Sequence, residues 1–199
     1  DFTDEMIEVI GKYPNIMPSI HLPVQSGSSR VLKLMGRRYT KESYLELFDK
    51  IKKIVPGCAV STDIIVGFPG ETEEDFQETL DLVNKCKYDN AFTFIFSERE
   101  GTPACKLKDK VEESVKEERL QRLNAVVNKY FLENNKKLEG KVVEVLVEGL
   151  SDKDNMYYGY TDTNKLINFT VDKDIKVGDI VKVKVVDAKT WSLDGELCE

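Results

Sequence analysis

The first 110 residues alternate between strand-like and helix-like segments, and this alternation restricts the possible folds more than any other feature. Residues 16–23 form an extended apolar segment. Residues 59–66 are typical of a buried strand in a parallel sheet, because Ile64, Ile65 and Val66 follow one another without polar alternation. Residues 91–96 form a third strand. Helical patterns separate these strands, so the sequence predicts an α/β fold with a parallel sheet.

Helix boundary signals support this reading. Thr40 is a good N-cap for a helix that stops at Pro56-Gly57, and Thr72 and Asp75 have the spacing of a capping box. Residues 4–13 also have a helical pattern, but no strand precedes them. Three strand–helix units cannot close a β/α barrel. We therefore expect a partial, TIM-like β/α barrel, with further units encoded upstream of residue 1.

The pattern changes near residue 138. Residues 114–138 form one long amphipathic helix, with Gly140 as its C-cap. Five short strands follow, at residues 142–147, 156–160, 166–169, 180–186 and 192–197. Five strands in so short a segment predict a small, OB-like, all-β barrel. The expected domains are residues 1–137 and residues 138–199.

Charge argues weakly against a nucleic-acid partner. The net charge is −7, and residues 137–199 carry 9 basic and 13 acidic side chains. Because phosphate contacts need lysine and arginine, RNA binding here would require a local patch. No apolar run approaches the length of a membrane span, and nothing at the start resembles a signal peptide. We expect a cytoplasmic protein with no membrane partner.

The four cysteines are too far apart for a close-spaced metal or redox motif. Cys58, Cys86, Cys105 and Cys198 are separated by 28, 19 and 93 residues. In the cytoplasm we expect four unpaired thiols and no metal ligands within this chain.

Ligands of parallel β/α folds bind at the carboxyl ends of the strands. Gln25 and Ser26 follow the first strand, and the turn from Gly67 to Glu71 follows the second. Asp63 lies within the second strand, where a buried carboxylate needs partners. Two interpretations stay open: Asp63 bonds to the barrel backbone or Arg37, or it accepts hydrogen bonds from ligand hydroxyls. His21, the only histidine, is expected to be a hydrogen-bonded barrel residue rather than a catalytic one.

The second domain is rich in aromatic residues. Stacking on aromatic faces, together with amide and lysine contacts, is how small β-barrels hold unpaired RNA bases. At least half of these aromatics are expected to fill the core instead. The residues concerned are Tyr157, Tyr158, Tyr160, Phe169 and Trp191, with Asn164, Lys165 and Asn168 nearby in sequence.

Several long strings resemble the MiaB-type methylthiotransferases, a radical S-adenosylmethionine family. They are HLPVQSGS (21–28), STDIIVGFPGET (61–72), AFTFIFS (91–97) and GTPA (101–104). Residues 138–199 resemble the TRAM domain that ends those proteins. Within the family, GYTDTNKLINF (159–169) and TWSLDGE (190–196) look like the branch that acts on isopentenyladenosine in tRNA.

The resemblance implies a chemistry. Family members attach a methylthio group to C2 of the adenine beside the anticodon, using S-adenosylmethionine and two 4Fe–4S clusters. The cysteine triads that hold those clusters are absent from this chain, so the fragment alone should be inactive. The implied partners are the tRNA anticodon arm and a reductant for the cluster.

The resemblance also implies roles for individual residues. Gln25 and Asp63 would bond the ribose hydroxyls of S-adenosylmethionine, and Arg37 its carboxylate. Ser26 and the turn would complete the cofactor site, the turn bordering the adenine. Its residues are Gly67, Phe68, Pro69, Gly70 and Glu71. The candidates for RNA binding are Tyr160, Asn164, Lys165, Asn168 and Trp191.

Two alternatives remain open. One is a non-catalytic RNA-binding protein in which the half-barrel is a scaffold, and Gln25 and Asp63 have no ligand. The other is a methylthiotransferase of the branch that acts on a ribosomal protein or on threonylcarbamoyladenosine.

Overall fold

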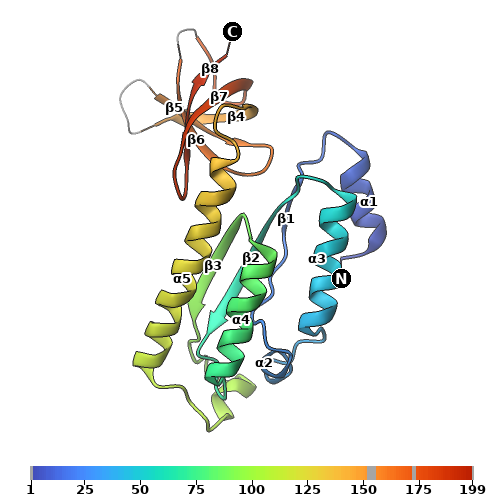
Figure 1. Cartoon of the computed structure of the whole chain (residues 1–199), viewed down its shortest axis with the longest axis vertical. Coiled ribbons are helices and arrows are strands. Elements are labelled where there is room, and N and C mark those ends of the chain that lie inside the picture. The colour runs from blue at the N-terminus through green and yellow to red at the C-terminus, as the bar shows by residue number, and fades with distance from the viewer. Residues whose placement is uncertain (1, 152–155, 172–173, 199) are drawn as a thin grey trace. The chain divides into compact units, whose positions relative to one another are not determined.

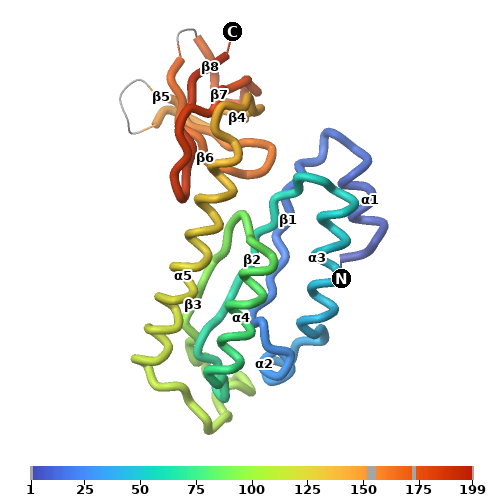
Figure 2. The backbone as a smooth tube through the Cα atoms, in the orientation of Figure 1, coloured from blue at the N-terminus to red at the C-terminus, as the bar shows by residue number. Residues whose placement is uncertain are grey.

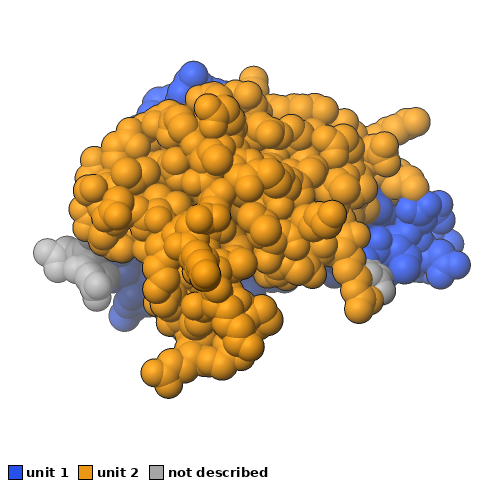
Figure 3. Space-filling model, turned by 90° about the horizontal axis from the view of Figure 1, so that it is seen from below, with its two compact units in different colours: residues 1–19, 57–59, 129–199 blue, residues 20–56, 60–128 orange. Residues whose placement is uncertain are grey.

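The structure is a computed structural model that describes residues 2–151, 156–171 and 174–198. Its contacts divide the chain into two compact units, which Figure 3 distinguishes by colour. One unit comprises residues 20–56 and 60–128, and the other comprises residues 1–19, 57–59 and 129–199. The long helix α5 (Glu113–Lys136) crosses this division. The predicted domain boundary between residues 137 and 138 stays a prediction.

A three-stranded sheet organises the first unit. Its strands are β1 (Ser19–His21), β2 (Ala59–Val66) and β3 (Asn90–Ile95), in the order β1-β2-β3 (Figure 1). β2 and β3 are parallel, with Ser61 opposite Asn90 and Val66 opposite Ile95. The prediction of a partial α/β fold with a parallel sheet is therefore confirmed.

Burial alternates along β2, which corrects the expectation of a strand buried throughout. Val60, Thr62, Ile64 and Val66 are buried, whereas the residues between them, including Asp63, are partly exposed. The same alternation continues on β3. The run of apolar residues in β2 concealed this two-faced character, because only one face of the sheet is fully covered.

Two helices with strong N-caps cover the buried face of the sheet. The predicted caps are confirmed: Thr40 precedes α3 (Lys41–Ile54) and Thr72 precedes α4 (Glu73–Cys86), each in a reciprocal capping box. The two helices run alongside the sheet in Figure 2. Their apolar faces are buried, with Tyr44, Phe48 and Ile51 on α3 and Phe76, Leu80 and Val83 on α4.

Three short elements complete this part of the chain. The predicted helix near the start is present as α1 (Asp4–Lys12), capped by Thr3. Two elements were not anticipated, namely α2 (Ser29–Leu34) and the 3-10 turn η1 (Pro103–Lys106). Both are too short to produce a recognisable hydrophobic period.

The predicted long amphipathic helix is α5. Leu123, Val127 and Phe131 form its buried stripe, at intervals of one helical turn. The stripe continues into a polar residue at each end, because Arg119 and Asn135 are also buried. None of the helices in the described ranges is both long enough and apolar enough to cross a membrane.

The second unit contains a closed five-stranded barrel in the order β4-β5-β6-β8-β7, as predicted. β6 and β8 are parallel, and the other neighbours are antiparallel. The strands are β4 (Val142–Leu150), β5 (Met156–Thr161), β6 (Leu166–Thr170), β7 (Ile180–Ala188) and β8 (Leu193–Leu197).

The barrel core is built from branched apolar side chains around a single buried ring. Phe169 is fully buried, and Tyr157 packs against it with ring centroids 6.4 Å apart. Tyr160 and Trp191 lie outside the core. The other core residues are Val145, Val147, Ile167, Val183, Val185, Ala188 and Leu193.

Candidate functional site

A cavity of about 570 Å³ lies on the partly exposed side of the three-stranded sheet. It brings together Gln25, Arg37 and Asp63, three of the residues that the sequence singled out. Side chains after the third strand close it, among them Arg99. The remaining lining residues are Ile65, Phe94, Ile95, Phe96, Ser97, Thr102 and Ala104. The volume is in the range of small-molecule sites.

Two backbone hydrogen bonds hold Gln25 at the cavity in a strained conformation. Its N–H donates to the carbonyl of Asp63 at 2.8 Å, and its carbonyl accepts from the N–H of Ile65 at 2.9 Å. Between these two bonds Gln25 has a φ of 66°, in the left-handed region that glutamine rarely adopts. Such strain is concentrated at functional sites, because there it aims a side chain that a relaxed strand would point elsewhere.

Asp63 points from β2 toward a polar pair on the same face of the sheet. One carboxylate oxygen lies 3.5 Å from Nε2 of His21, whose Nδ1 is 2.9 Å from the hydroxyl of Ser61. The His21 ring also meets the edge of Phe92, with centroids 6.1 Å apart. His21 is thus hydrogen-bonded, as expected. The Asp63 carboxylate is 29% exposed and can accept hydrogen bonds from a ligand.

The donor set of the cavity fits S-adenosylmethionine. An ionised carboxylate accepts hydrogen bonds from ribose hydroxyls, and a guanidinium can bind a carboxylate through two parallel hydrogen bonds. Asp63 and Arg37 supply these groups, and Phe94 and Phe96 supply apolar surface. The roles themselves stay predictions.

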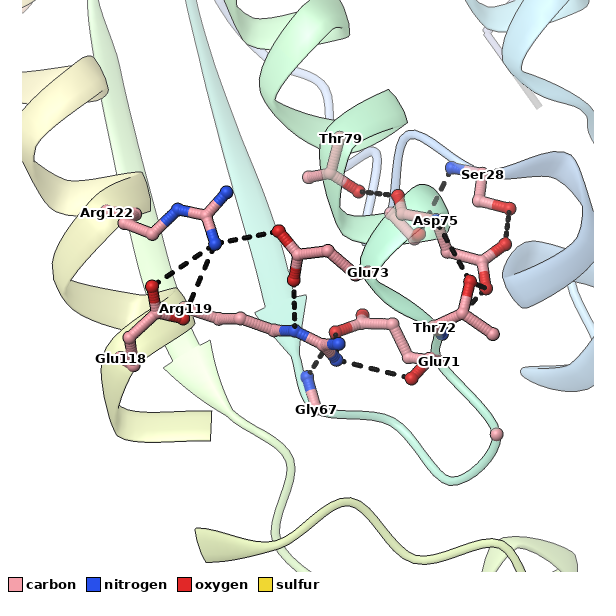
Figure 4. Close-up of polar contacts among 12 residues, drawn as sticks. Ser28, Gly67, Glu71, Thr72, Glu73, Asp75, Thr79, Glu118, Arg119 and Arg122 are labelled. Atoms are coloured by element: carbon pink, nitrogen blue, oxygen red, sulfur yellow. Dashed lines mark hydrogen bonds and ion pairs between the residues drawn. The ribbon is translucent and has the colours of Figure 1, made fainter. Parts of the chain in front are cut away.

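Glu71 has a different surrounding from the one expected of a cofactor ligand. Its carboxylate accepts from the N–H of Gly67 at 2.9 Å and from Nη1 of Arg119 on α5 at 2.8 Å (Figure 4). The side chains of this pair are only 1% and 5% exposed. Burial raises the pKa of Glu71, and the Gly67 N–H and the guanidinium oppose that rise. Glu71 does not line the cavity that contains Asp63.

The Glu71–Arg119 pair is the centre of a larger network between α4 and α5. Glu73 lies 3.5 Å from Nε of Arg119 and 2.7 Å from Nη1 of Arg122. Both guanidinium groups also lie over the ring of Phe76, at 5.6 and 4.8 Å from its centroid. Figure 4 shows the two arginines extending from α5 toward the start of α4. The network fixes α5 against the turn that follows β2.

The backbone of the turn is closely packed. Gly67 has a φ of 73°, and a Cβ built on it would lie 2.3 Å from Cγ of Lys116. The Gly70 N–H donates to the carbonyl of Asp109, and the Glu71 N–H donates to the carbonyl of Phe68 at 2.9 Å. The N–H groups of Gly67, Gly70 and Glu71 therefore have intramolecular acceptors, and glycine serves close packing here.

The remaining turn residues and Ser26 do not line the same cavity as Asp63. Phe68 is buried, and its ring packs edge-to-face against Phe96, with centroids 4.9 Å apart. Because Phe96 lines the cavity and Phe68 does not, Phe68 supports the cavity wall. Pro69 and Gly70 line a second cavity of about 530 Å³. Ser26 is fully buried, and its hydroxyl accepts from the N–H of Ser28. A cofactor role for these residues stays a prediction.

Asp75 joins the loop after β1 to the start of α4. Its carboxylate accepts from the hydroxyl of Ser28 at 2.6 Å, from the N–H of Thr72 at 2.8 Å and from the guanidinium of Arg30. Burial raises the pKa of Asp75, but these hydrogen bonds outweigh burial and hold it well below its usual range. The loop that carries Gln25 is thereby anchored.

Four of the five candidate RNA residues form two pairs. Tyr160 and Asn168 project from the outer surface of neighbouring strands, and the hydroxyl of Ser151 lies 3.1 Å from Oδ1 of Asn168. Lys165 and Trp191 lie instead where β6 and β8 begin, and Nζ of Lys165 donates to Oδ1 of Asn135 at 3.0 Å. The fifth residue, Asn164, occupies the turn before β6 with a φ of 58°.

Known protein families account for most of the chain. Residues 1–83 match the radical SAM superfamily, and residues 136–198 match the TRAM domain. Residues 1–83 therefore belong to a radical SAM domain, and the barrel is a TRAM domain. A curated protein of Bacillus cytotoxicus, tRNA-2-methylthio-N(6)-dimethylallyladenosine synthase, is 57% identical over the whole chain. Proteins of the same name from Bacillus cereus and Bacillus anthracis are 57% and 56% identical.

The chain spans 39% of the length of these relatives and matches their C-terminal part. Its own residues do not fit an iron–sulfur cluster. The structure has all four cysteines as thiols, and the described residues contain no group of three side chains suited to a metal ion. The described residues thus provide the candidate cavity and the TRAM barrel, but no cluster ligands.

The thiols should differ sharply in reactivity. Cys58 and Cys86 are buried, and burial raises the pKa of Cys86 to about 11, whereas Cys105 and Cys198 are partly exposed. Because thiolates are the reactive form, iodoacetamide at neutral pH should modify Cys105 and Cys198 first. Peptide mass mapping measures the order of labelling, with unfolded protein as the control. Equal rates at Cys86 and Cys105 in the folded chain would contradict the burial described here.

Proposed function

We propose that this chain is the C-terminal part of a radical SAM tRNA methylthiotransferase, which methylthiolates C2 of isopentenyladenosine beside the anticodon. The curated relatives that match the whole chain are named tRNA-2-methylthio-N(6)-dimethylallyladenosine synthase. The resemblance of residues 159–169 and 190–196 favours the same branch. Ligands for two 4Fe–4S clusters, and the contact surface for a reductant, belong to the part of the enzyme outside this chain. The proposed location is the cytoplasm, where tRNA is modified.

The observation that carries this proposal is the convergence of Gln25, Arg37 and Asp63 on one cavity. Asp63 and Gln25 would bond the ribose hydroxyls of S-adenosylmethionine, and Arg37 its carboxylate. With a cluster present, the bound cofactor supplies a radical that activates the substrate. The work of this chain is to orient the cofactor and exclude water from it, through the apolar walls formed by Phe94 and Phe96.

The direct test uses the whole enzyme. The reading frame upstream of Asp1 should encode a Cys-x-x-x-Cys-x-x-Cys triad and a second set of three cysteines. After anaerobic cluster reconstitution, the full-length protein should convert isopentenyladenosine in tRNA to its methylthio derivative, as detected by mass spectrometry of nucleosides. A frame without the triad would favour a non-catalytic RNA-binding protein with a scaffold half-barrel. Modification of a ribosomal protein or of threonylcarbamoyladenosine would assign another branch.

The TRAM domain is proposed to hold the tRNA anticodon arm. Replacing Lys165 and Asn168 together by alanine should weaken tRNA binding by the intact enzyme about tenfold, because two polar contacts to RNA are lost. The cleavage of S-adenosylmethionine should not change, since the cavity is in the other unit. Filter binding at two salt concentrations measures the effect. Because residues 137–199 carry 9 basic and 13 acidic groups, the salt dependence should be shallow.

The matched control replaces Lys182 and Glu144, which lie opposite each other on β7 and β4, by alanine. This change removes a similar number of polar groups from the barrel surface without touching the proposed contacts. Normal tRNA binding by the Lys165 and Asn168 double variant would place the contacts elsewhere on the domain.

A further inference from the structure

One buried amide connects a candidate RNA residue, Lys165, with the turn that carries another, Trp191. Asn135 lies on the last turn of α5 and is 4% exposed. Its Nδ2 donates to the carbonyl of Lys189 at 2.8 Å and to that of Thr190 at 3.1 Å, and its Oδ1 accepts from Nζ of Lys165 at 3.0 Å. A buried amide costs free energy unless its polar groups are hydrogen-bonded. Here both ends of the amide are used.

Lys165 and the turn at residues 189–192 immediately precede two neighbouring strands, β6 and β8. β6 and β8 are parallel, with Ile167 opposite Leu193. Because Asn135 bonds both Nζ of Lys165 and the carbonyls of Lys189 and Thr190, the ammonium group and the turn that carries Trp191 lie at the same end of the barrel, beside the last turn of α5.

The segment that carries Trp191 is a tight turn with fixed ends. The N–H of Lys189 donates to the carbonyl of Ser192 at 2.8 Å, and Nζ of Lys189 pairs with Asp194. Trp191 itself is 72% exposed, the most exposed large apolar side chain among the described residues. An indole presented to solvent on a braced turn offers a flat aromatic face to a ligand.

We infer that Asn135 is a positioning residue, which holds Lys165 and Trp191 as one docking corner for an unpaired RNA base. The inference rests on the proposed tRNA function and deepens it. The indole offers a flat face on which a base can stack, and the adjacent ammonium can contact the phosphate or base edge beside it. The acidic surface of the barrel disfavours duplex RNA, which is held mainly through phosphates.

The chain offers a direct optical test because Trp191 is its only tryptophan. The probe is an RNA hairpin with an unpaired, adenine-rich loop, titrated into the 199-residue chain at low salt. Stacking of a base on Trp191 should quench its emission as the complex forms. The fully paired duplex of the same stem should bind weakly and leave the emission unchanged.

Replacing Asn135 by alanine should weaken hairpin binding about tenfold and lower the quench at saturation, because the turn is no longer braced. The time-resolved anisotropy of Trp191 in the unbound variant should also fall. Asn135→Asp separates the two contacts, since it keeps the acceptor for Lys165 and removes the donors to the turn. It should lower the quench as Asn135→Ala does and retain more affinity than that variant.

Asn134→Ala is the matched control, because Asn134 is the preceding residue on α5 and its Oδ1 accepts from Nζ of Lys137 instead. It should behave as the wild type, and circular dichroism checks that each variant is folded. Wild-type affinity and quench in Asn135→Ala would overturn the inference. Hairpin binding without any change in Trp191 emission would also overturn it and leave the proposed tRNA binding intact. If the wild-type chain does not bind the hairpin, the RNA part of the proposed function fails as well.

Discussion

Replacing Arg119 by methionine should lower the free energy of unfolding by about 3–5 kcal/mol. Methionine preserves most of the apolar volume of the side chain but removes the cation that faces Glu71 at 2.8 Å. The carboxylate would then be buried with the Gly67 N–H as its remaining partner in this network, so the pKa of Glu71 should rise further. Urea denaturation of the chain, followed by circular dichroism, measures the loss.

Arg122→Met is the matched control for this experiment. Arg122 lies on the same helix, also pairs with Glu73 and also covers Phe76, but its side chain is 38% exposed. Exposed ion pairs contribute little, so the control should lose less than about 1 kcal/mol. Equal losses in the two variants would show that burial of the Glu71 pair is not what stabilises the turn. The double variant Glu71→Gln with Arg119→Met should recover part of the loss, because no buried charge remains.

Replacing Asp63 by alanine in the full-length, cluster-loaded enzyme should weaken S-adenosylmethionine binding by about 1–3 kcal/mol, roughly fivefold to 150-fold. The carboxylate accepts two ribose hydroxyls in the proposed complex, and water would have to replace it. Equilibrium binding, with the iron content of each preparation measured in parallel, gives the affinity. Unchanged affinity with an intact cluster would make Asp63 a structural partner of His21, which lies 3.5 Å away.

Glu98→Ala is the control for Asp63. Glu98 lies between the cavity residues Ser97 and Arg99 in sequence, but its carboxylate pairs with Lys110 at 2.7 Å. Its loss should leave the affinity for S-adenosylmethionine unchanged within about twofold. Asp63→Asn is informative as well, because it keeps one acceptor oxygen and should therefore bind better than Asp63→Ala.

The sequence alone determined the order of elements and the fold class. Periodic apolar residues and capping signals lie within single segments, so they predict α3, α4 and α5 without knowledge of the rest of the chain. The five short strands likewise predicted the barrel. The sequence also singled out Gln25, after the first strand, and Asp63, within the second, and both line one cavity in the structure. Their role in binding a cofactor stays a prediction.

Only the tertiary structure decided which of these polar residues act together. Glu71 looks in sequence like a ligand at a glycine-rich turn, yet its carboxylate bonds Arg119, 48 residues away. Arg119 itself stands in a run of charged residues that is typical of an exposed helix face. Nothing local distinguishes it from Arg122, because burial depends on the elements that pack against a helix.

The same reason explains Asn135. In sequence it is one of two adjacent asparagines near the end of a helix, whereas in the structure it is buried and bonds residues 30, 54 and 55 positions further along the chain. Closure of the barrel brings the starts of β6 and β8 to the end of α5, and it does so through strand pairing rather than through any local signal. The residue types of both sites can be read from the sequence, but their partners are set by long-range packing.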